Sequence, residues 1–243
     1  MSSTMGRIYG VGLGPGAQDL LSVRADRLVR DTRHIAYFRK AGRPGQARGI
    51  VADMLRNDAV ELAMEYPVTT EIPLDDPRYN ARMSVFYADC TDRLLAIARA
   101  GEDVVVLCEG DPFFYGSFMH LHSRLLGHAP VEVVPGITGM AGAWHATDMP
   151  FTWGDDVLTV VMATLPEEEL VRRIRDTDAL VVMKIGRHLA KLRRAVMAAG
   201  RTNAAWLVEH AAMPGQRVTR LAQADQVTPY FSILLIHGQG RRP

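Results

Sequence analysis

The sequence contains little cysteine, little lysine and no long hydrophobic run. Cys90 and Cys108 are its only cysteines, and their spacing matches neither a zinc site nor a disulfide framework. The eight histidines form no local ligand spacing, so we expect reduced thiols and no protein-bound metal. The longest apolar runs, such as residues 104–108 and 233–236, are far shorter than the roughly 20 residues that span a bilayer. We therefore expect no membrane-spanning segment.

Neither sign of charge dominates, because 28 basic and 27 acidic residues leave a formal charge of +1 over 243 residues. A nucleic-acid-binding domain is usually more basic, so we expect no nucleic-acid partner. Among the basic residues only Lys40, Lys184 and Lys191 are lysines. This arginine bias suits a substrate that carries carboxylates, although GC-rich coding is the favoured explanation. Residues 1–6 lead into a strand-like run without a signal-peptide pattern, so we expect a cytoplasmic protein.

The order of apolar runs and helical periodicities predicts an α/β fold with two α/β domains. In the first half we expect strands at 8–13, 34–38, 60–64 and 104–108, and helices at 20–31, capped by Asp19, and at 78–100. We expect a short strand at 131–134, where the second half begins. In the second half we expect strands at 157–162, 179–183, 204–208, 217–221 and 232–236, and helices at 167–175 and 187–199. Gly127, Pro130 and Pro135 interrupt the pattern between the halves. The sequence therefore predicts domains at 1–129 and 130–243, the second with a mixed sheet.

Three loops rich in glycine follow predicted strands, at residues 10–17, 109–117 and 135–140. Ligands of open α/β sheets bind outside the carboxyl ends of the strands, so each loop is a candidate part of a site. Taken from Gly12, the first loop fits a dinucleotide fingerprint that ends at Ala17. Arg39, at the end of the next strand, then favours an NADP-dependent reductase over an NAD enzyme. A binding protein without catalysis is a further alternative.

These loops, together with residues 183–188 and 229–232, resemble the tetrapyrrole methylase family, the S-adenosylmethionine-dependent enzymes of corrin and sirohaem synthesis. The resemblance spans nearly the whole chain and is greatest to members that methylate C20 of precorrin-2. It implies a homodimer of two-domain subunits with the cofactor in a cleft between the domains. The implied reaction releases S-adenosylhomocysteine. The cobalt-containing acceptor, cobalt-factor II, and other tetrapyrrole positions remain open as alternatives.

The resemblance also assigns contacts with the cofactor residue by residue. Ile185 replaces the methionine that the family often has at its position, which keeps an apolar side chain there. The expected cofactor contacts are Pro15, Gly110, Asp111, Ser117, Thr138, Gly139, Ile185, Ala211 and Ser232.

Proton removal from the methylated carbon needs a modest base, for which Asp111, Lys184 and Tyr230 are the candidates. Lys184 ends an apolar run, and we expect partial burial to lower its pKa. Structural alternatives are a helix cap for Asp111, an ion pair for Lys184 and simple packing for Tyr230. The expected contacts with the substrate, mostly with its carboxylates, are Arg39, Lys40, Arg43, Arg187 and Tyr115.

Overall fold

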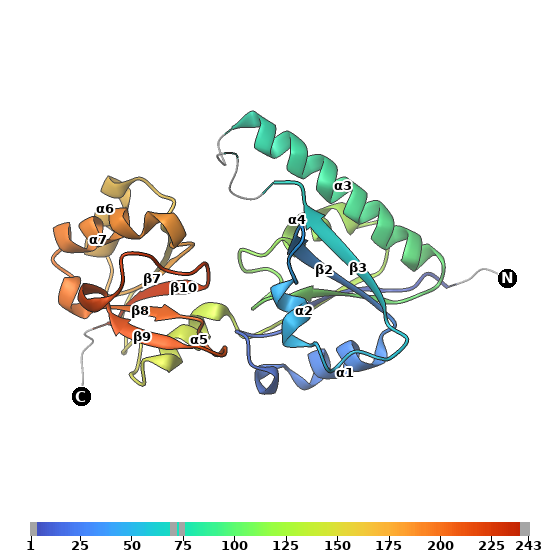
Figure 1. Ribbon diagram of the computed structural model, residues 1–243, viewed down its shortest axis with the longest axis horizontal. Helices are drawn as coiled ribbons and strands as arrows, with labels where there is room; N and C mark the ends of the chain where they lie inside the picture. Colours follow the sequence, from blue (N-terminus) through green and yellow to red (C-terminus); the bar gives the residue numbers. More distant parts are fainter. Residues whose placement is uncertain (1–3, 69–71, 73–75, 239–243) are drawn as a thin grey trace. The chain divides into compact units, whose positions relative to one another are not determined.

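The computed structural model describes residues 4–68, 72 and 76–238 of the chain. It divides into two compact units, Met1–Thr138 and Gly139–Pro243, and each unit contains a five-stranded sheet (Figure 1). Each unit is described by itself below.

The first unit is built on a parallel sheet with the strand order β3-β2-β4-β1-β5. Its strands are β1 (Ile8–Gly12), β2 (His34–Lys40), β3 (Val60–Tyr66), β4 (Val104–Cys108) and β5 (Val131–Val134). Its helices are α1 (Val23–Asp31), α2 (Gln46–Ile50), α3 (Pro77–Arg99) and α4 (Phe118–Leu125), with a short 3-10 helix η1 (Gln18–Leu20). All five carboxyl ends therefore lie at one edge of this sheet.

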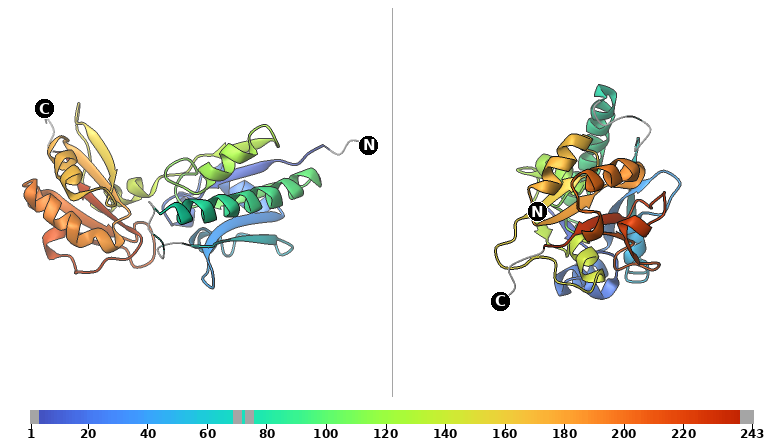
Figure 2. Two further views of the ribbon diagram at one scale, coloured as in Figure 1. Left: turned by 90° about the horizontal axis from the view of Figure 1, so that it is seen from above. Right: turned by 90° about the vertical axis from the view of Figure 1, so that its left-hand side faces the viewer.

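The central strand β4 explains why helices cover both faces of this sheet (Figures 1 and 2). All five of its residues are buried, and successive side chains point to opposite faces. Val104 and Val106 pack in a core with residues of α3 and α4, whereas Val105 and Leu107 pack with residues of α1 and α2. A parallel strand buried on both faces reads as a continuous apolar run, which is how the sequence predicts it.

Two helices of the first unit, α1 and α3, begin at side-chain caps. Asp76 accepts a hydrogen bond from the Arg78 amide (2.8 Å) at the start of α3, and Ser22 accepts one from the Ala25 amide (3.1 Å) at the start of α1. The prediction that Asp19 caps the second element is therefore wrong. Asp19 lies in η1, because the chain makes a 3-10 turn after the glycine loop before α1 begins.

The second unit has a mixed sheet with the strand order β6-β7-β10-β8-β9. Its strands are β6 (Leu158–Met162), β7 (Ala179–Met183), β8 (Ala205–Glu209), β9 (Arg217–Arg220) and β10 (Ser232–Ile236). Its helices are α5 (Gly139–Ala146), α6 (Glu167–Arg175) and α7 (Leu189–Ala198), with 3-10 turns η2 (Gly186–His188), η3 (Thr202–Ala204) and η4 (Leu221–Gln223). Since β10 runs antiparallel to β7 and β8, its first residue lies at the edge where β6, β7 and β8 end.

The two units divide at a different place from the boundary predicted between residues 129 and 130. β5 pairs in parallel with β1, so residues 131–134 complete the first sheet, and the units divide between Thr138 and Gly139. Pro130 and Pro135, which flank β5, bound a strand and not a domain. The predictions for β4, β5, β7, β10 and α6 are confirmed in both bounds.

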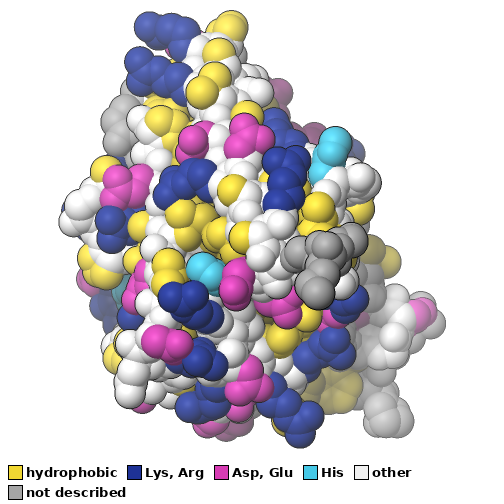
Figure 3. Space-filling model, turned by 90° about the vertical axis from the view of Figure 1, so that its right-hand side faces the viewer, with side chains coloured by type: hydrophobic (Ala, Val, Ile, Leu, Met, Phe, Trp, Pro, Cys, Tyr) yellow, Lys and Arg dark blue, Asp and Glu magenta, His cyan; other side chains and the backbone are white. Residues whose placement is uncertain are grey.

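Many arginines form ion pairs at the surface. Examples join Arg7 to Glu132 (2.9 Å) and Arg48 to Glu61 (2.8 Å). Figure 3 accordingly shows basic and acidic side chains interspersed over the face that it presents. Within the described part of the chain, no helix is both long and apolar enough to cross a bilayer.

Candidate active site

The first unit brings the three glycine-rich loops together, because β4, β1 and β5 are neighbours. Gly14 and Gly110 form an isolated bridge, in which the Gly110 amide donates to the Gly14 carbonyl (2.8 Å) and the Gly14 amide donates to the Gly110 carbonyl (3.3 Å). Pro15, which is buried, follows directly. The loops after β1 and β4 are thus joined by backbone alone.

Glycines let the backbones of these loops touch. A Cβ atom at Gly136 would lie 2.1 Å from the Gly110 carbonyl oxygen and 2.8 Å from the Cα of Gly12. A Cβ atom at Gly12 would lie 2.5 Å from the Gly136 amide nitrogen. Gly12, Gly110 and Gly136 therefore pack as one backbone cluster, which we call the glycine cluster. Glycines this dense after a strand indicate close approach of the backbone to a ligand or to another chain segment, and the structure shows approach to other chain segments.

Asp111 connects the loop after β4 with the loop after β5. Its Oδ1 accepts a hydrogen bond from the Phe113 amide (2.9 Å), and its Oδ2 accepts one from the Gly136 amide (3.1 Å). Both carboxylate oxygens are thus held by backbone donors beside the glycine cluster. These bonds give Asp111 a structural role in joining two loops. The predicted helix cap is wrong, because α4 begins only at Phe118.

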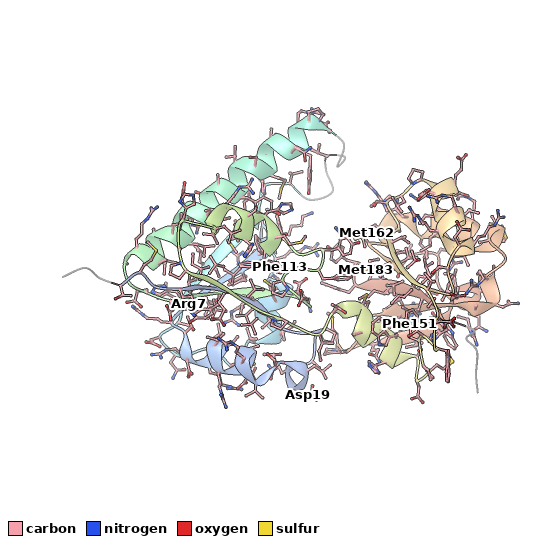
Figure 4. All side chains as sticks on the ribbon, turned by 180° about the vertical axis from the view of Figure 1, so that it is seen from behind. Arg7, Asp19, Phe113, Phe151, Met162 and Met183 are labelled. Carbon is pink, nitrogen blue, oxygen red and sulfur yellow. The ribbon has the colours of Figure 1, made fainter. Side chains whose placement is uncertain are left out.

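The end of the loop after β4 contacts β3. The Ser117 hydroxyl lies 2.5 Å from the Tyr66 hydroxyl, and Ser117 makes no side-chain cap bond to α4. Phe113, labelled in Figure 4, and Tyr115 are both about half exposed in this loop. Tyr115 has a left-handed backbone (φ 55°), and its ring packs edge-on against Phe114 at 4.9 Å.

The predicted substrate contacts of the first unit lie on the neighbouring strand β2. Lys40 is its last residue, and the exposed Arg43 follows in a turn that returns its amide to the Lys40 carbonyl (3.0 Å). Arg39 pairs instead with Glu65 of β3, with 2.6 Å between Nη2 and Oε1. This pair engages Nε and Nη2 of Arg39.

The second unit gathers the remaining predicted residues at one sheet edge. Lys184 and Ile185 follow β7, Ala211 follows β8, and Tyr230 directly precedes the start of β10 at Ser232. Ser232 pairs with Glu209 in the register of β10 and β8. Met162 and Met183, labelled in Figure 4, are paired at the ends of β6 and β7. The exposed Arg187 lies in η2, shortly after β7.

The predicted residues at this edge differ in how far they are exposed to solvent. Lys184 is exposed, so the partial burial that the sequence predicts for it is wrong. Ile185 is fully buried, and its side chain packs in the core with residues of α6 and α7. Tyr230 is 73% exposed and packs edge-on against Phe231 at 5.1 Å. Ser232 is buried, and its hydroxyl donates to the Pro229 carbonyl (2.8 Å).

Strained backbone is concentrated in these loops. Among the described residues, five non-glycine residues have positive φ: Tyr115, Asp148, Lys184, His210 and Ala212. All but Asp148 lie in the segments that follow β4, β7 and β8. Such conformations cost about 1–3 kcal/mol each and persist mainly where the surrounding structure enforces them, often at functional sites.

Thr138 and Gly139 occupy the end of the first unit and the start of the second. Gly139 begins α5, and a Cβ atom there would lie 3.9 Å from Ile233 Cδ1, an ordinary contact. Packing within the second unit therefore does not require glycine at this position. If Gly139 contacts the cofactor, as the resemblance implies, that contact is a separate reason for glycine at this position.

Residues that the sequence reasoning missed lie around Glu209. Glu209 is buried, and its carboxylate accepts hydrogen bonds from Thr228 and Arg217. Gln216 accepts a hydrogen bond from the Ala212 amide. The available signal was a glutamate that directly follows the apolar run of β8, since a buried carboxylate needs partners.

The geometry does not support the NADP-dependent reductase. A dinucleotide fingerprint places the phosphates at the N-terminus of the helix that its glycines open. Here β1 ends at Gly12, η1 intervenes and α1 begins only at Val23. Arg39, the expected contact for a 2′-phosphate, is paired with Glu65.

The sequence profile of the tetrapyrrole (corrin/porphyrin) methylases matches residues 7–225. The chain is 48% identical to a precorrin-2 C(20)-methyltransferase from Sinorhizobium sp over 240 residues, 98% of each chain. It is 28% identical to a cobalt-precorrin-2 C(20)-methyltransferase from Salmonella typhimurium, over 96% of this chain and 97% of that one. The fold is similar to that of a uroporphyrin-III C-methyltransferase from Thermus thermophilus complexed with S-adenosylhomocysteine, with a TM-score of 0.65, 23% identity and coverage of 96% and 97%. The chain therefore belongs to the tetrapyrrole methylase family.

Proposed function

We propose that this chain transfers a methyl group from S-adenosylmethionine to C20 of precorrin-2, giving precorrin-3A in cobalamin synthesis. One observation carries the choice of reaction, the 48% identity to a precorrin-2 C(20)-methyltransferase over nearly the full length of both chains. The signatures at residues 107–118, 183–188 and 229–232 led to the same acceptor from the sequence alone.

The positions of the predicted residues fit S-adenosylmethionine. Each of them lies at, or directly after, the edge of a sheet where parallel strands end. In the first unit the tight packing of the glycine cluster brings the loops after β1, β4 and β5 together at this edge. In the second unit the strained turns after β7 and β8 present backbone groups at the corresponding edge. When bound, this cofactor supplies a methyl group already activated by a sulfonium.

Activation by the cofactor leaves the protein mainly with positioning, which contributes roughly 7–11 kcal/mol in well-oriented reactions. Asp111 holds two of the loops in place through its backbone hydrogen bonds. Lys184 and Tyr230, both exposed at the edge of the second sheet, remain our candidates to accept the proton that C20 loses. A positioned acid or base typically accelerates such a step by about 10²–10⁴-fold.

The carboxylates of the substrate have basic partners available at the same sheet edges. Lys40 ends β2, the immediate neighbour of β4, Arg43 follows β2, and Arg187 follows β7. We assign these three residues, with Tyr115, to the acetate and propionate side chains and to the ring. Arg39, which shares part of its guanidinium with Glu65, is the fourth basic residue that we assign to these carboxylates.

Cobalt-factor II is the second candidate acceptor. The relative named for the metal-free substrate is 48% identical, whereas the relative named for the cobalt-containing substrate is 28% identical. The larger identity favours metal-free precorrin-2. A cytoplasmic homodimer completes the proposal. It rests on the family resemblance, and light scattering of the purified protein measures the assembly directly.

The reaction is tested by anaerobic incubation with methyl-labelled S-adenosylmethionine and either precorrin-2 or its cobalt complex. Mass spectrometry and NMR then locate the added methyl group. We expect one labelled methyl at C20, with faster transfer to the metal-free acceptor. Transfer to another carbon, or to neither acceptor, contradicts the proposed reaction.

A further inference from the structure

A doubly strained turn follows β8 in the second unit. His210 has φ 51° and Ala212 has φ 55°, so two of three consecutive residues adopt the left-handed conformation that favours glycine. Ala211, which we assign to the cofactor, lies between them. A turn of this shape needs contacts that hold it, because both side chains oppose the conformation.

Gln216 supplies one such contact. Its Oε1 accepts a hydrogen bond from the Ala212 amide (2.7 Å), from the far side of the turn. Backbone bonds join the same segment, from Met213 to the His210 carbonyl (2.9 Å) and from Gln216 to the Met213 carbonyl (3.1 Å). The side chain of Gln216 is thus the only acceptor recorded for the Ala212 amide within the described residues.

Glu209 anchors the start of the turn. It is only 3% exposed, and its Oε2 accepts a hydrogen bond from Arg217 Nε (2.5 Å). Its Oε1 accepts one from the Thr228 hydroxyl (2.9 Å). A buried carboxylate that loses a partner is strongly unfavourable, so these bonds fix the end of β8.

The same network reaches the start of β10. The Thr228 hydroxyl also lies 2.6 Å from the Ser232 hydroxyl, and the His210 amide donates to the Phe231 carbonyl (2.8 Å). The segments that carry Ala211 and Ser232 are therefore cross-linked. We propose that Gln216 and Glu209 are positioning residues, which hold the strained turn around Ala211 in the shape that binds the cofactor. This inference rests on the proposed use of S-adenosylmethionine.

Gln216 gives the sharper test, because it is exposed and its loss leaves no buried charge. Gln216→Leu removes the acceptor while keeping a side chain of similar size. We expect the Kd for S-adenosylhomocysteine, measured by calorimetry, to rise about tenfold, the worth of one hydrogen bond in a preorganised turn. The KM for S-adenosylmethionine should rise in parallel, with kcat nearly unchanged. Gln216→Glu, which keeps an acceptor, should bind like wild type.

Rescue distinguishes positioning from a general loss of structure. Ala212→Gly removes the side chain that opposes positive φ, so the double variant Gln216→Leu/Ala212→Gly should recover most of the lost affinity. Gln223→Leu, at an exposed glutamine of η4, is the matched control and should leave the Kd unchanged. Thermal melting of each variant without ligand accompanies every measurement.

Each outcome decides the inference. Weaker binding by Gln216→Leu with rescue by glycine supports it. Wild-type affinity in Gln216→Leu overturns it and leaves the proposed cofactor intact. Loss of affinity that follows the melting temperature and is not rescued makes Gln216 merely structural, which also overturns it. If wild type itself does not bind S-adenosylhomocysteine, the proposed function fails and the inference fails with it.

Discussion

Asp111 has a carboxylate with two oxygens that each accept a backbone hydrogen bond, from Phe113 and from Gly136. These bonds hold both oxygens against loop backbone, whereas a general base must direct an oxygen at its substrate. We expect Asp111→Asn to keep kcat within about tenfold of wild type, well short of the 10²–10⁴-fold effect of a general base. The same change should lower stability by about 1–3 kcal/mol, because an amide cannot accept both bonds equally. Urea unfolding and the pH profile of kcat measure the two effects.

A pH profile that loses an acidic limb in Asp111→Asn, with stability unchanged, would restore Asp111 as the base. Asp26 offers a matched control, since it pairs with Arg30 on the surface of α1. Asp26→Asn should change neither kcat nor stability by a measurable amount.

Lys184 is a candidate base that lies exposed at the edge where β7 ends. If it assists proton removal, Lys184→Met should lower kcat at least about 100-fold, in the range of general acid–base catalysis, with the Kd for S-adenosylhomocysteine nearly unchanged. Steady-state kinetics and calorimetry provide the two numbers. A kcat within a few-fold of wild type would make Lys184 a structural residue and leave Tyr230 as the remaining candidate.

At the scale of single residues, the sequence predicted where site residues lie in the fold better than what their side chains do. Most predicted cofactor contacts lie in loops that follow strands, because glycine-rich loops after apolar strands are local signals. The role of Asp111 depends on Gly136, and the burial of Glu209 depends on Thr228 and Arg217. These partners are distant in the sequence, so nothing local to either carboxylate identifies them.

At the scale of elements, the glycine cluster is the feature most sensitive to substitution. Gly136→Ala places a Cβ atom 2.1 Å from the Gly110 carbonyl oxygen, so the loops after β4 and β5 must separate. We expect a loss of about 2–3 kcal/mol in stability, typical of overpacking, together with loss of S-adenosylhomocysteine binding. Chemical unfolding and calorimetry measure both.

Gly49→Ala is the matched control for that change. Gly49 lies in α2, and a Cβ atom there would have no neighbour within 4 Å. Alanine should stabilise this helical position by roughly 0.5–1 kcal/mol and leave binding unchanged. Equal stability of Gly136→Ala and wild type would show that the close packing of the glycine cluster is not required.

Most helices and strands were predictable from the sequence, whereas the pairing of strands within a sheet was not. β4, β5, β7 and β10 have the predicted bounds, since short apolar runs between breakers are strong local signals. The helix α4 was not predicted, because its residues directly follow a loop of aromatics and glycines. The position of β5 beside β1 depends on pairing across the sheet, which explains the misplaced domain boundary.

At the scale of the whole molecule, cysteine and tryptophan are divided between the two units, so unfolding of each unit can be followed by a different signal. Cys90 and Cys108 belong to the first unit, whereas Trp144, Trp153 and Trp206 belong to the second. Burial raises the pKa of Cys90 to about 12 and that of Cys108 well above its usual range. Since only the thiolate reacts, labelling near pH 8 should report unfolding of the first unit. Tryptophan fluorescence reports the second unit.

These probes test whether the proposed cofactor site draws on both units. A ligand that binds only the folded state stabilises it by about 2.7 kcal/mol at 100 times its Kd. Because the assigned contacts run from Pro15 to Ser232, S-adenosylhomocysteine should shift the urea midpoints of thiol labelling and of tryptophan fluorescence upward together. Gly136→Ala, with its site disrupted, should show neither shift. A ligand-dependent shift in one probe alone would confine the site to that unit and remove the other unit's residues from the assignment.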